Sequence, residues 1–250
     1  MDLDGLTHPE LHRLRADALA AGRAADAAGI LDELRARERR HHTGELLEIY
    51  DDSLRPRGVR ERGLVHLEGD WHRSFHCWVV SPARGTLLAQ RRALTKATYP
   101  GALDTTVAGH YRAGEGLADV CREGEEEIGL ALHPERLVPL GRSVDAARHG
   151  VLLDREVADV FLFAADTPLS ALRPDAREVA EVLEVPLAEA LAMFRGEAPD
   201  APALALAAGE GQPRAVRIRA AEFTGHLDRY YPRLALQAQR VAAGLPPLCI

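Results

Sequence analysis

Acidic side chains are concentrated in the segment from Gly109 to Leu130, which reads GHYRAGEGLADVCREGEEEIGL. Glu123, Glu126 and Glu127 are spaced i, i+3 and i+4, so a helix would place their carboxylates on one face. Clustered carboxylate oxygens suit Mg²⁺ or Mn²⁺, which are hard ions that also bind substrate phosphates. The segment therefore predicts a divalent-cation site, although a solvated acidic helix is the alternative interpretation of the same charges.

The opposite face of this expected helix is apolar or small. Leu117, Cys121, Gly124 and Ile128 follow one another at steps of four, three and four residues, which return to nearly the same angle at about 100° per residue. The stripe predicts a helix that begins near Leu117 and packs on a core, and Gly129 predicts its C-terminal end.

The segment resembles the Nudix box, a loop-helix-loop diphosphate site. In that pattern a glycine is followed by five residues, a glutamate, seven residues, Arg-Glu, an apolar residue, any residue, Glu-Glu, any residue, Gly and an apolar residue. This chain departs from the pattern twice, because only six residues separate Glu115 from Arg122 and because Gly124 occupies the usual apolar position. The matching positions are Gly109, Glu115, Arg122, Glu123, Glu126, Glu127, Gly129 and Leu130.

The resemblance implies hydrolysis of a diphosphate linked to a second moiety, such as a nucleoside diphosphate derivative, with Mg²⁺ or Mn²⁺ as cofactor. The ion held by Glu123, Glu126 and Glu127 would neutralise the diphosphate and lower the pKa of a bound water. Glu127 or Glu123 is the expected base, Glu156 is the alternative base, and Arg122 is expected to orient the carboxylates. Gly109 and Glu115 are expected to contribute to substrate binding.

A longer stretch, from about residue 46 to 190, is similar to the Nudix branch that contains type I isopentenyl-diphosphate isomerase and its hydrolase relatives. In the isomerases a catalytic cysteine precedes Gly-His, whereas Ala108 precedes Gly109-His110 here. An alanine cannot exchange a proton with carbon, so hydrolysis is the expected reaction and isomerisation an alternative. A second alternative is a catalytically silent Nudix module that binds a nucleotide or a partner protein through the N-terminal arm, for which the shortened spacing after Glu115 is the support.

The metal site of that branch also has matching positions in this chain. The resemblance implies His66, His72 and His110 as metal ligands, together with the acidic pair Asp154 and Glu156. Imidazole and carboxylate groups form a suitable ligand set for a divalent metal. His66 and His72 fit ordinary strand or loop positions equally well, while His110 adjoins the box and Glu156 precedes the apolar run VADVFLF. We therefore expect His110 and Glu156 to line the same pocket as the box glutamates.

Three cations, Arg91, Arg92 and Lys96, follow the apolar run LLAQ. They either face substrate phosphates, since a guanidinium can donate two hydrogen bonds to phosphate oxygens, or lie in solvent as loop cations.

These residues must be positioned by short β-rich runs that begin near residue 45 and are separated by turns. Strands are expected at 46–50, 74–80, 85–90, 136–141, 156–164, 179–186 and 215–219, and helices at 187–194 and 227–243. Residues 196–213, rich in Ala, Pro and Gly, are expected to form a loose connection.

Residues 8–42 carry leucines at helical spacing and predict one broken helix or two short ones, interrupted at Gly22 and Gly29. The expected fold class is α/β (α+β): a Nudix fold whose mixed central β-sheet lies between helices, with a helical N-terminal arm. The expected domains are the arm at 1–44, a Nudix hydrolase domain at 45–204 and a C-terminal strand and helix at 205–250 that pack on it.

The composition of the 250-residue chain limits its partners. A net charge of -7 argues against binding a nucleic acid polymer, which needs an excess of basic residues. Three cysteines without a C-x-x-C pair favour a reducing cytoplasm over a disulfide framework, and neither a signal segment nor a membrane span is predicted. We expect a cytoplasmic protein with a small-molecule diphosphate substrate, whose arm packs on its own domain or on that of a second subunit in a homodimer.

Overall fold

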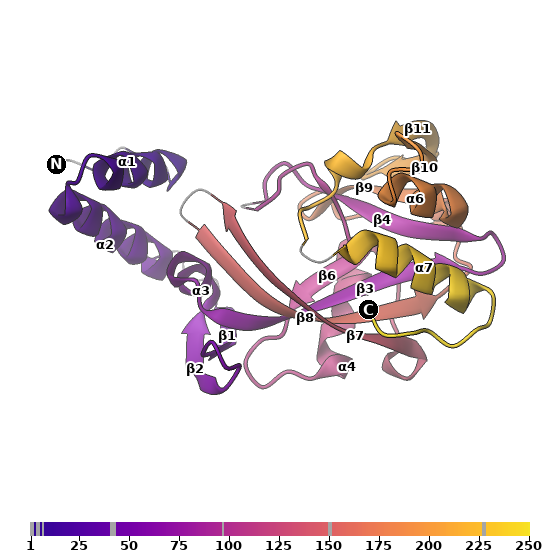
Figure 1. Ribbon diagram of the computed structural model, residues 1–250, viewed down its shortest axis with the longest axis horizontal. Coiled ribbons are helices and arrows are strands. Elements are labelled where there is room, and N and C mark those ends of the chain that lie inside the picture. Colours follow the sequence, from indigo (N-terminus) through magenta and orange to yellow (C-terminus); the bar gives the residue numbers. More distant parts are fainter. Residues whose placement is uncertain are drawn as a thin grey trace. The chain divides into compact units, whose positions relative to one another are not determined.

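The computed structural model describes residues 3, 6, 8–40, 44–96, 98–149, 152–226 and 229–250 (Figure 1). Residues 1, 2, 4, 5, 7 and 41–43 of the expected arm and residues 227–228 of the expected last helix lie outside these. The chain divides into two compact units. The first comprises residues 1–73, 112–114 and 146–156, and the second comprises residues 74–111, 115–145 and 157–250.

The N-terminal arm in the first unit is a pair of helices, α1 (His8–Ala20) and α2 (Ala24–Arg40). The chain turns between them at Gly22, whose φ of +70° favours glycine. The expected interruption at Gly29 is wrong, because this residue lies inside α2; glycine costs a helix interior only about 1 kcal/mol relative to alanine. Leu11 of α1 and Ile30 of α2 are fully buried in a cluster that also contains Leu67.

Leu67 belongs to α3 (Arg62–Glu68), a short helix that the sequence patterns did not predict. The Glu61 side chain caps it by accepting a hydrogen bond from the Leu64 backbone N–H at 3.3 Å. Gly69 ends it at φ +72°, where a Cβ would lie 2.6 Å from a Leu153 methyl carbon. Strands β1 (Leu46–Tyr50) and β2 (Pro56–Glu61) run antiparallel beside α3, and β1 also pairs with the start of β3 (Trp71–Ser81). The sheet and the capped helix therefore fix the residues around His66 and His72.

The second unit contains a sheet with the strand order β11-β10-β9-β4-β3, in which β5 lies beside β4, β6 and β8 beside β3, and β7 beside β8. Neighbouring strands run antiparallel in the pairs β3–β4, β3–β6, β4–β5, β4–β9, β9–β10 and β10–β11. The strands are β4 (Thr86–Arg92), β5 (Leu103–Asp104), β6 (Val107–His110), β7 (Leu137–His149), β8 (Leu152–Ala164), β9 (Val179–Pro186), β10 (Ala201–Ala207) and β11 (Arg214–Ile218).

Helices pack on both faces of this sheet. Alternate residues of each strand face opposite sides, so one strand contributes apolar side chains to both layers. Trp78, Val80 and Leu183 pack in one apolar cluster with α6 (Leu187–Phe194) and α7 (Tyr230–Ala242). Phe75 and Cys77 pack in a second cluster with the box helices α4 (Leu117–Val120) and α5 (Arg122–Ile128). Short 3₁₀ turns occur at Pro134–Arg136, Leu169–Ala171 and Ala220–Glu222. The expected α+β class, with a sheet between helices and a helical arm, is confirmed.

The expected loose connection at residues 196–213 is wrong, because β10 lies within it. Ala201, Ala203 and Ala205 are buried while Pro202 and Leu204 are exposed, and β10 is hydrogen-bonded between β9 and β11. Alanine and proline have low strand propensity, but pairing on both sides overrides it. Among the described helices, none is long and apolar enough to cross a membrane.

Candidate functional site

The box segment forms two short helices, α4 and α5, which meet at Cys121. At this joint the Gly124 N–H bonds to the Cys121 carbonyl, three residues back, at 3.3 Å. An uninterrupted α-helix would bond four residues back. The expected helix start at Leu117 is therefore confirmed, but the helix is broken at Cys121. The expected C-terminal end at Gly129 is confirmed, since its φ is +68° and its N–H bonds to the Glu125 carbonyl at 3.1 Å.

Two glycines of the segment allow close approaches that a side chain would block. A Cβ on Gly124 would lie 2.5 Å from the Leu130 carbonyl oxygen and 2.6 Å from Leu132 Cγ. This contact accounts for the departure from the usual apolar residue, because the chain after α5 fills the space. A Cβ on Gly109 would lie 2.8 Å from Glu123 Cγ, so this glycine lets the end of β6 pack against α5.

Arg122 links the carboxylates of the segment. Its Nη1 donates to Glu115 Oε1 and its Nη2 to Glu123 Oε1, each at 2.9 Å. Its Nε lies 3.8 Å from Glu126 Oε1, and the Glu126 side chain is 58% exposed. The shortened spacing therefore still brings Glu115 to the box arginine, and one guanidinium offsets part of the repulsion among the acids.

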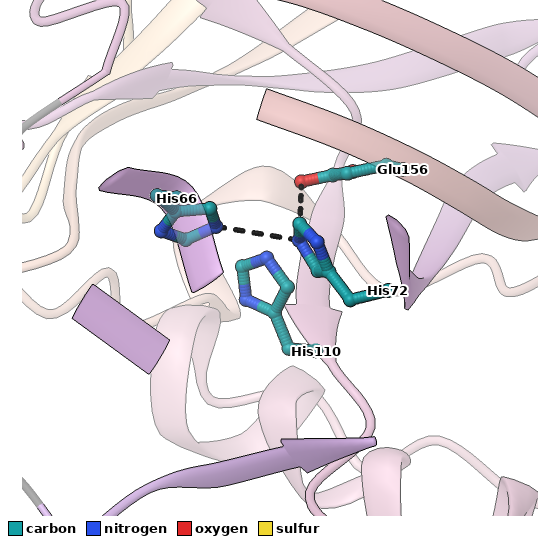
Figure 2. A group of neighbouring side chains, drawn as sticks. All are labelled: His66, His72, His110 and Glu156. Atoms are coloured by element: carbon teal, nitrogen blue, oxygen red, sulfur yellow. Dashed lines mark hydrogen bonds and ion pairs between the residues drawn. The ribbon is translucent and has the colours of Figure 1, made fainter. Parts of the chain in front are cut away.

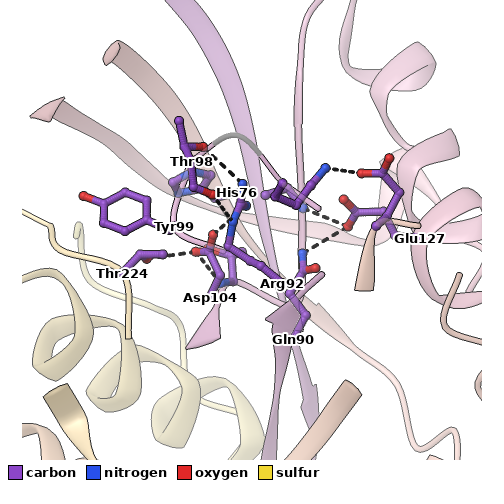
Figure 3. Close-up of polar contacts among 12 residues, drawn as sticks. His76, Gln90, Arg92, Thr98, Tyr99, Asp104, Glu127 and Thr224 are labelled. Atoms are coloured by element: carbon purple, nitrogen blue, oxygen red, sulfur yellow. Dashed lines mark hydrogen bonds and ion pairs between the residues drawn. The ribbon is translucent and has the colours of Figure 1, made fainter. Parts of the chain in front are cut away.

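Glu127 is the buried acid of the box, with 5% of its surface exposed. Its Oε2 accepts hydrogen bonds from Gln90 Nε2 at 3.2 Å and from the Ala108 backbone N–H at 3.3 Å (Figure 3). Burial and the negative charge of Glu123 raise the pKa of Glu127 to about 8, while Lys96 acts in the opposite direction. Lys96 itself pairs with Glu178.

The two arginines after LLAQ are engaged by the protein. Arg91 donates to Glu181 at 3.0 Å, to the Gly101 carbonyl at 3.0 Å and to Glu222 at 3.1 Å. Arg92 donates to Asp104 Oδ2 at 3.1 Å and also binds Thr98 (Figure 3). Neither lies in solvent as a loop cation, and a substrate phosphate would have to compete with these partners.

The second group of chemically active side chains is rich in imidazole. His66 of α3, His72 of β3, His110 of β6 and Glu156 of β8 each offer a ligand atom, and these atoms all lie within 4.8 Å of one another (Figure 2). His66 Nε2 lies 3.3 Å from His72 Nε2, and Glu156 Oε1 lies 3.8 Å from the same His72 nitrogen. Asp154 Oδ1 lies 3.7 Å from Nε2 of both His66 and His72.

The hydrogen bonds of this group favour metal coordination. The Asp70 carbonyl lies 3.0 Å from His72 Nδ1 and can only accept, so Nδ1 carries a proton and the lone pair of a neutral His72 is on Nε2. Asp154 Oδ1 is buried and has no hydrogen-bond partner within the described chain. Burial and the neighbouring Glu156 raise the pKa of Asp154 to about 7. Burial is the largest single influence on the pKa of His72 and lowers it, but Glu156, Asp154 and the Asp70 carbonyl together outweigh burial, so the pKa of His72 is raised. These donors fit a divalent cation, which would satisfy the lone pairs and the orphan oxygen together.

The central part of the chain is similar to known proteins. The model of the NUDIX domain matches residues 70–207. An uncharacterized Nudix hydrolase of Clostridium acetobutylicum is 32% identical over 152 residues, which cover 60% of this chain and 73% of that protein. An isopentenyl-diphosphate Delta-isomerase of Mycolicibacterium vanbaalenii is 36% identical over 147 residues, which cover 58% of this chain and 78% of that protein.

Among solved structures, the MutT protein of Methanosarcina mazei is 21% identical with a TM-score of 0.42, covering 49% of this chain and 82% of that one. The chain belongs to the Nudix family. Its relatives include proteins named as hydrolases and proteins named as isopentenyl-diphosphate isomerases.

Proposed function

We propose that this protein is a divalent-cation-dependent Nudix hydrolase that cleaves a diphosphate linked to a second moiety, such as a nucleoside diphosphate derivative. The observation that carries the proposal is the arrangement of the box. Glu127 is buried and fixed by two N–H donors, while Arg122 holds the Glu123 carboxylate beside it. A carboxylate kept oriented in this way is suited to a hydrolytic site.

Glu123, Glu126 and Glu127 are the residues that would hold Mg²⁺ or Mn²⁺. The ion would neutralise diphosphate charge and lower the pKa of a water molecule. Glu127 takes the proton of the attacking water in the proposed reaction, because it is the buried carboxylate of the box and two N–H donors hold it in one orientation. Glu123 and Glu156 are the alternatives. Arg122 keeps the Glu115 and Glu123 carboxylates in place.

We propose that the histidine group, formed by His66, His72, His110 and Glu156, holds a second divalent cation. Asp154 lies beside this group, with its Oδ1 near Nε2 of His66 and His72. Three imidazole nitrogens and a carboxylate match Mn²⁺ or a later transition metal better than Mg²⁺, which prefers oxygen ligands. Lys96 is the proposed phosphate-binding cation, since its charge already acts on Glu127 and it has a single ion-pair partner among the described residues, Glu178, to exchange for phosphate. Arg92 and Arg91 would contribute only after exchanging protein partners for phosphate.

Isomerisation of isopentenyl diphosphate is the second candidate, favoured by the relatives that carry that name. The residue that precedes Gly109-His110 is Ala108, whose methyl side chain has no acidic proton to exchange with the substrate. We therefore expect no deuterium from solvent D₂O in that substrate. If deuterium were incorporated at an enzyme-like rate, isomerisation would take the place of hydrolysis as the proposed reaction.

The proposed function is tested by phosphate release from nucleoside diphosphates, nucleotide sugars, dinucleotides, thiamine diphosphate and prenyl diphosphates. Each substrate is assayed with Mg²⁺, with Mn²⁺ and with a chelator. We expect metal-dependent turnover of at least one class. Binding of these compounds without turnover under any metal condition would instead support a catalytically silent module. The cytoplasmic location and the homodimer are further proposals, and sedimentation of the full chain tests the latter.

A further inference from the structure

Gln90 places a neutral amide against the buried acid of the Nudix box. It lies on β4 with 2% of its surface exposed, and its Nε2 donates to Glu127 Oε2 at 3.2 Å (Figure 3). Leu88, two residues earlier on the same face of the strand, packs in the apolar cluster with Ile128 of α5. An amide at the next position therefore interrupts an apolar face, and its burial is costly unless it is hydrogen-bonded.

The two donors to Glu127 act on the same oxygen. Ala108 N–H also bonds to Oε2, at 3.3 Å, so within the described chain both hydrogen bonds to this carboxylate end on Oε2. An amide and a backbone N–H orient a carboxylate without cancelling its charge, unlike the guanidinium that binds Glu123. The arrangement fixes the plane of the carboxylate and leaves Oε1 as the oxygen directed to other partners.

The backbone of Gln90 is fixed independently of this side chain. Gln90 pairs with Val182 of β9 on one side and with Asp104 of β5 on the other. Sheet pairing therefore holds the strand whatever the side chain at this position, and the amide is the part that acts on Glu127.

We infer that Gln90 is a positioning residue for hydrolysis, which holds Glu127 Oε2 so that Oε1 meets the cation or the attacking water. This inference rests on the proposed function, because it assigns Gln90 a role only through Glu127. Nothing in the Nudix box pattern includes Gln90, which lies on a separate strand.

The first test replaces the amide by a side chain of similar length, Gln90→Met, and measures kcat and KM separately. Losing one hydrogen bond to a charged group at the reacting centre is expected to lower kcat about 10- to 100-fold. KM should stay within about twofold, because substrate contacts are retained. Gln237→Met is the matched control: Gln237 is 3% exposed on α7 and accepts from the Leu248 N–H at 2.7 Å, and its replacement should leave kcat unchanged.

A double-mutant cycle separates positioning from general damage. In a Glu127→Gln background, Gln90→Met should change kcat less than about twofold, because the residue acts through Glu127. If Gln90→Met lowered kcat by the same factor in the Glu127→Gln background as in the wild type, the inference would be overturned. If circular dichroism shows that Gln90→Met does not fold, Gln90→Asn, which keeps the amide but shortens its reach, carries the same expected fall in kcat.

The outcomes distinguish the inference from the proposed function. Full activity of Glu127→Gln would remove the proposed function and the role of Gln90 with it. An inactive Glu127→Gln beside a fully active, folded Gln90→Met would retain the proposed function and overturn only the role of Gln90.

Discussion

Glu127 of the Nudix box and Asp154 beside the histidine group are both buried carboxyl groups with a raised pKa, about 8 and about 7 respectively. Their surroundings differ. Glu127 accepts from two neutral N–H donors, whereas Asp154 faces Nε2 of His66 and His72. Burial disfavours the charged form in both places, so the partners decide the chemistry. The two N–H donors orient Oε2 of Glu127. The imidazoles beside Asp154 offer nitrogen lone pairs, which suit transition metals.

The two groups also differ in how the chain assembles them. Glu115, Arg122, Glu123 and Glu126 come from one short segment and meet through a single guanidinium. The histidine group draws its side chains from a helix and three strands (Figure 2). A local motif can therefore be recognised from spacing, whereas the second group depends on the sheet that brings its members together.

Among the substitutions that test this comparison, Glu127→Gln is expected to have the largest effect on activity. It keeps the size of the side chain but removes the charge proposed to hold the cation and take the proton. We expect kcat to fall at least about a hundredfold, since even residues outside the ligand shell of a metal change activity 10- to 100-fold. Glu125→Gln on the exposed side of α5 is the control, and equal activity of the two variants would contradict the assignment.

Glu156→Gln tests whether the histidine group takes part in the same reaction. We expect kcat to fall about 10- to 100-fold with little change in KM, because a group that holds the metal or acts on the water contributes mainly in the transition state. Asp159→Asn on the same strand, which removes the ion pair with Arg142, should retain wild-type kcat. A Glu156→Gln enzyme with wild-type turnover would assign the histidine group a role outside catalysis.

Gly124→Val tests whether the departure from the box pattern is set by packing. The added side chain would meet the Leu130 carbonyl and Leu132, so the free energy of unfolding should fall by about 1–3 kcal/mol. Gly29→Ala is the contrast, because the space around Gly29 is open and alanine favours the helix by up to about 1 kcal/mol. Urea unfolding measures both, and a Gly124→Val protein as stable as wild type would show that the loop after α5 can move away.

The pH dependence of stability in the metal-free protein compares the two buried acids. Glu127 has a folded pKa of about 8, above its ordinary value of 4.5, so between these pH values the folded state binds more protons than the unfolded state. Stability should then fall as pH rises through this window, by at most about 1.4 kcal/mol per pH unit. Glu127→Gln should remove that part of the slope up to pH 8. Asp154→Asn should act over a window that ends near pH 7, the folded pKa of Asp154.

Several features could be predicted from the sequence because they depend on neighbours along the chain. Spacing alone indicated the acidic cluster of the box and the helix end at Gly129. The alternating and periodic runs located β9 at Val179–Pro186 and α6 at Leu187–Phe194. Pattern reasoning works for these elements because a strand period of two and a helix period of about 3.6 are written directly into the order of residues.

The tertiary structure decided which of these residues are buried and what they contact. Spacing placed Glu123, Glu126 and Glu127 together on one helix. The packing of α5 against the sheet then decided that Glu127 is buried beside Gln90 while Glu126 stays exposed. The signal for that contact was a glutamine directly after the apolar residues Leu87–Ala89, and its partner lies 37 positions away. Composition likewise suggested a loop where β10 forms, since hydrogen bonds from β9 and β11 determine the strand. Burial and strand pairing depend on residues that are distant in the sequence and close in space. The free energy that stabilises them therefore comes from contacts with other segments, which a local pattern does not include.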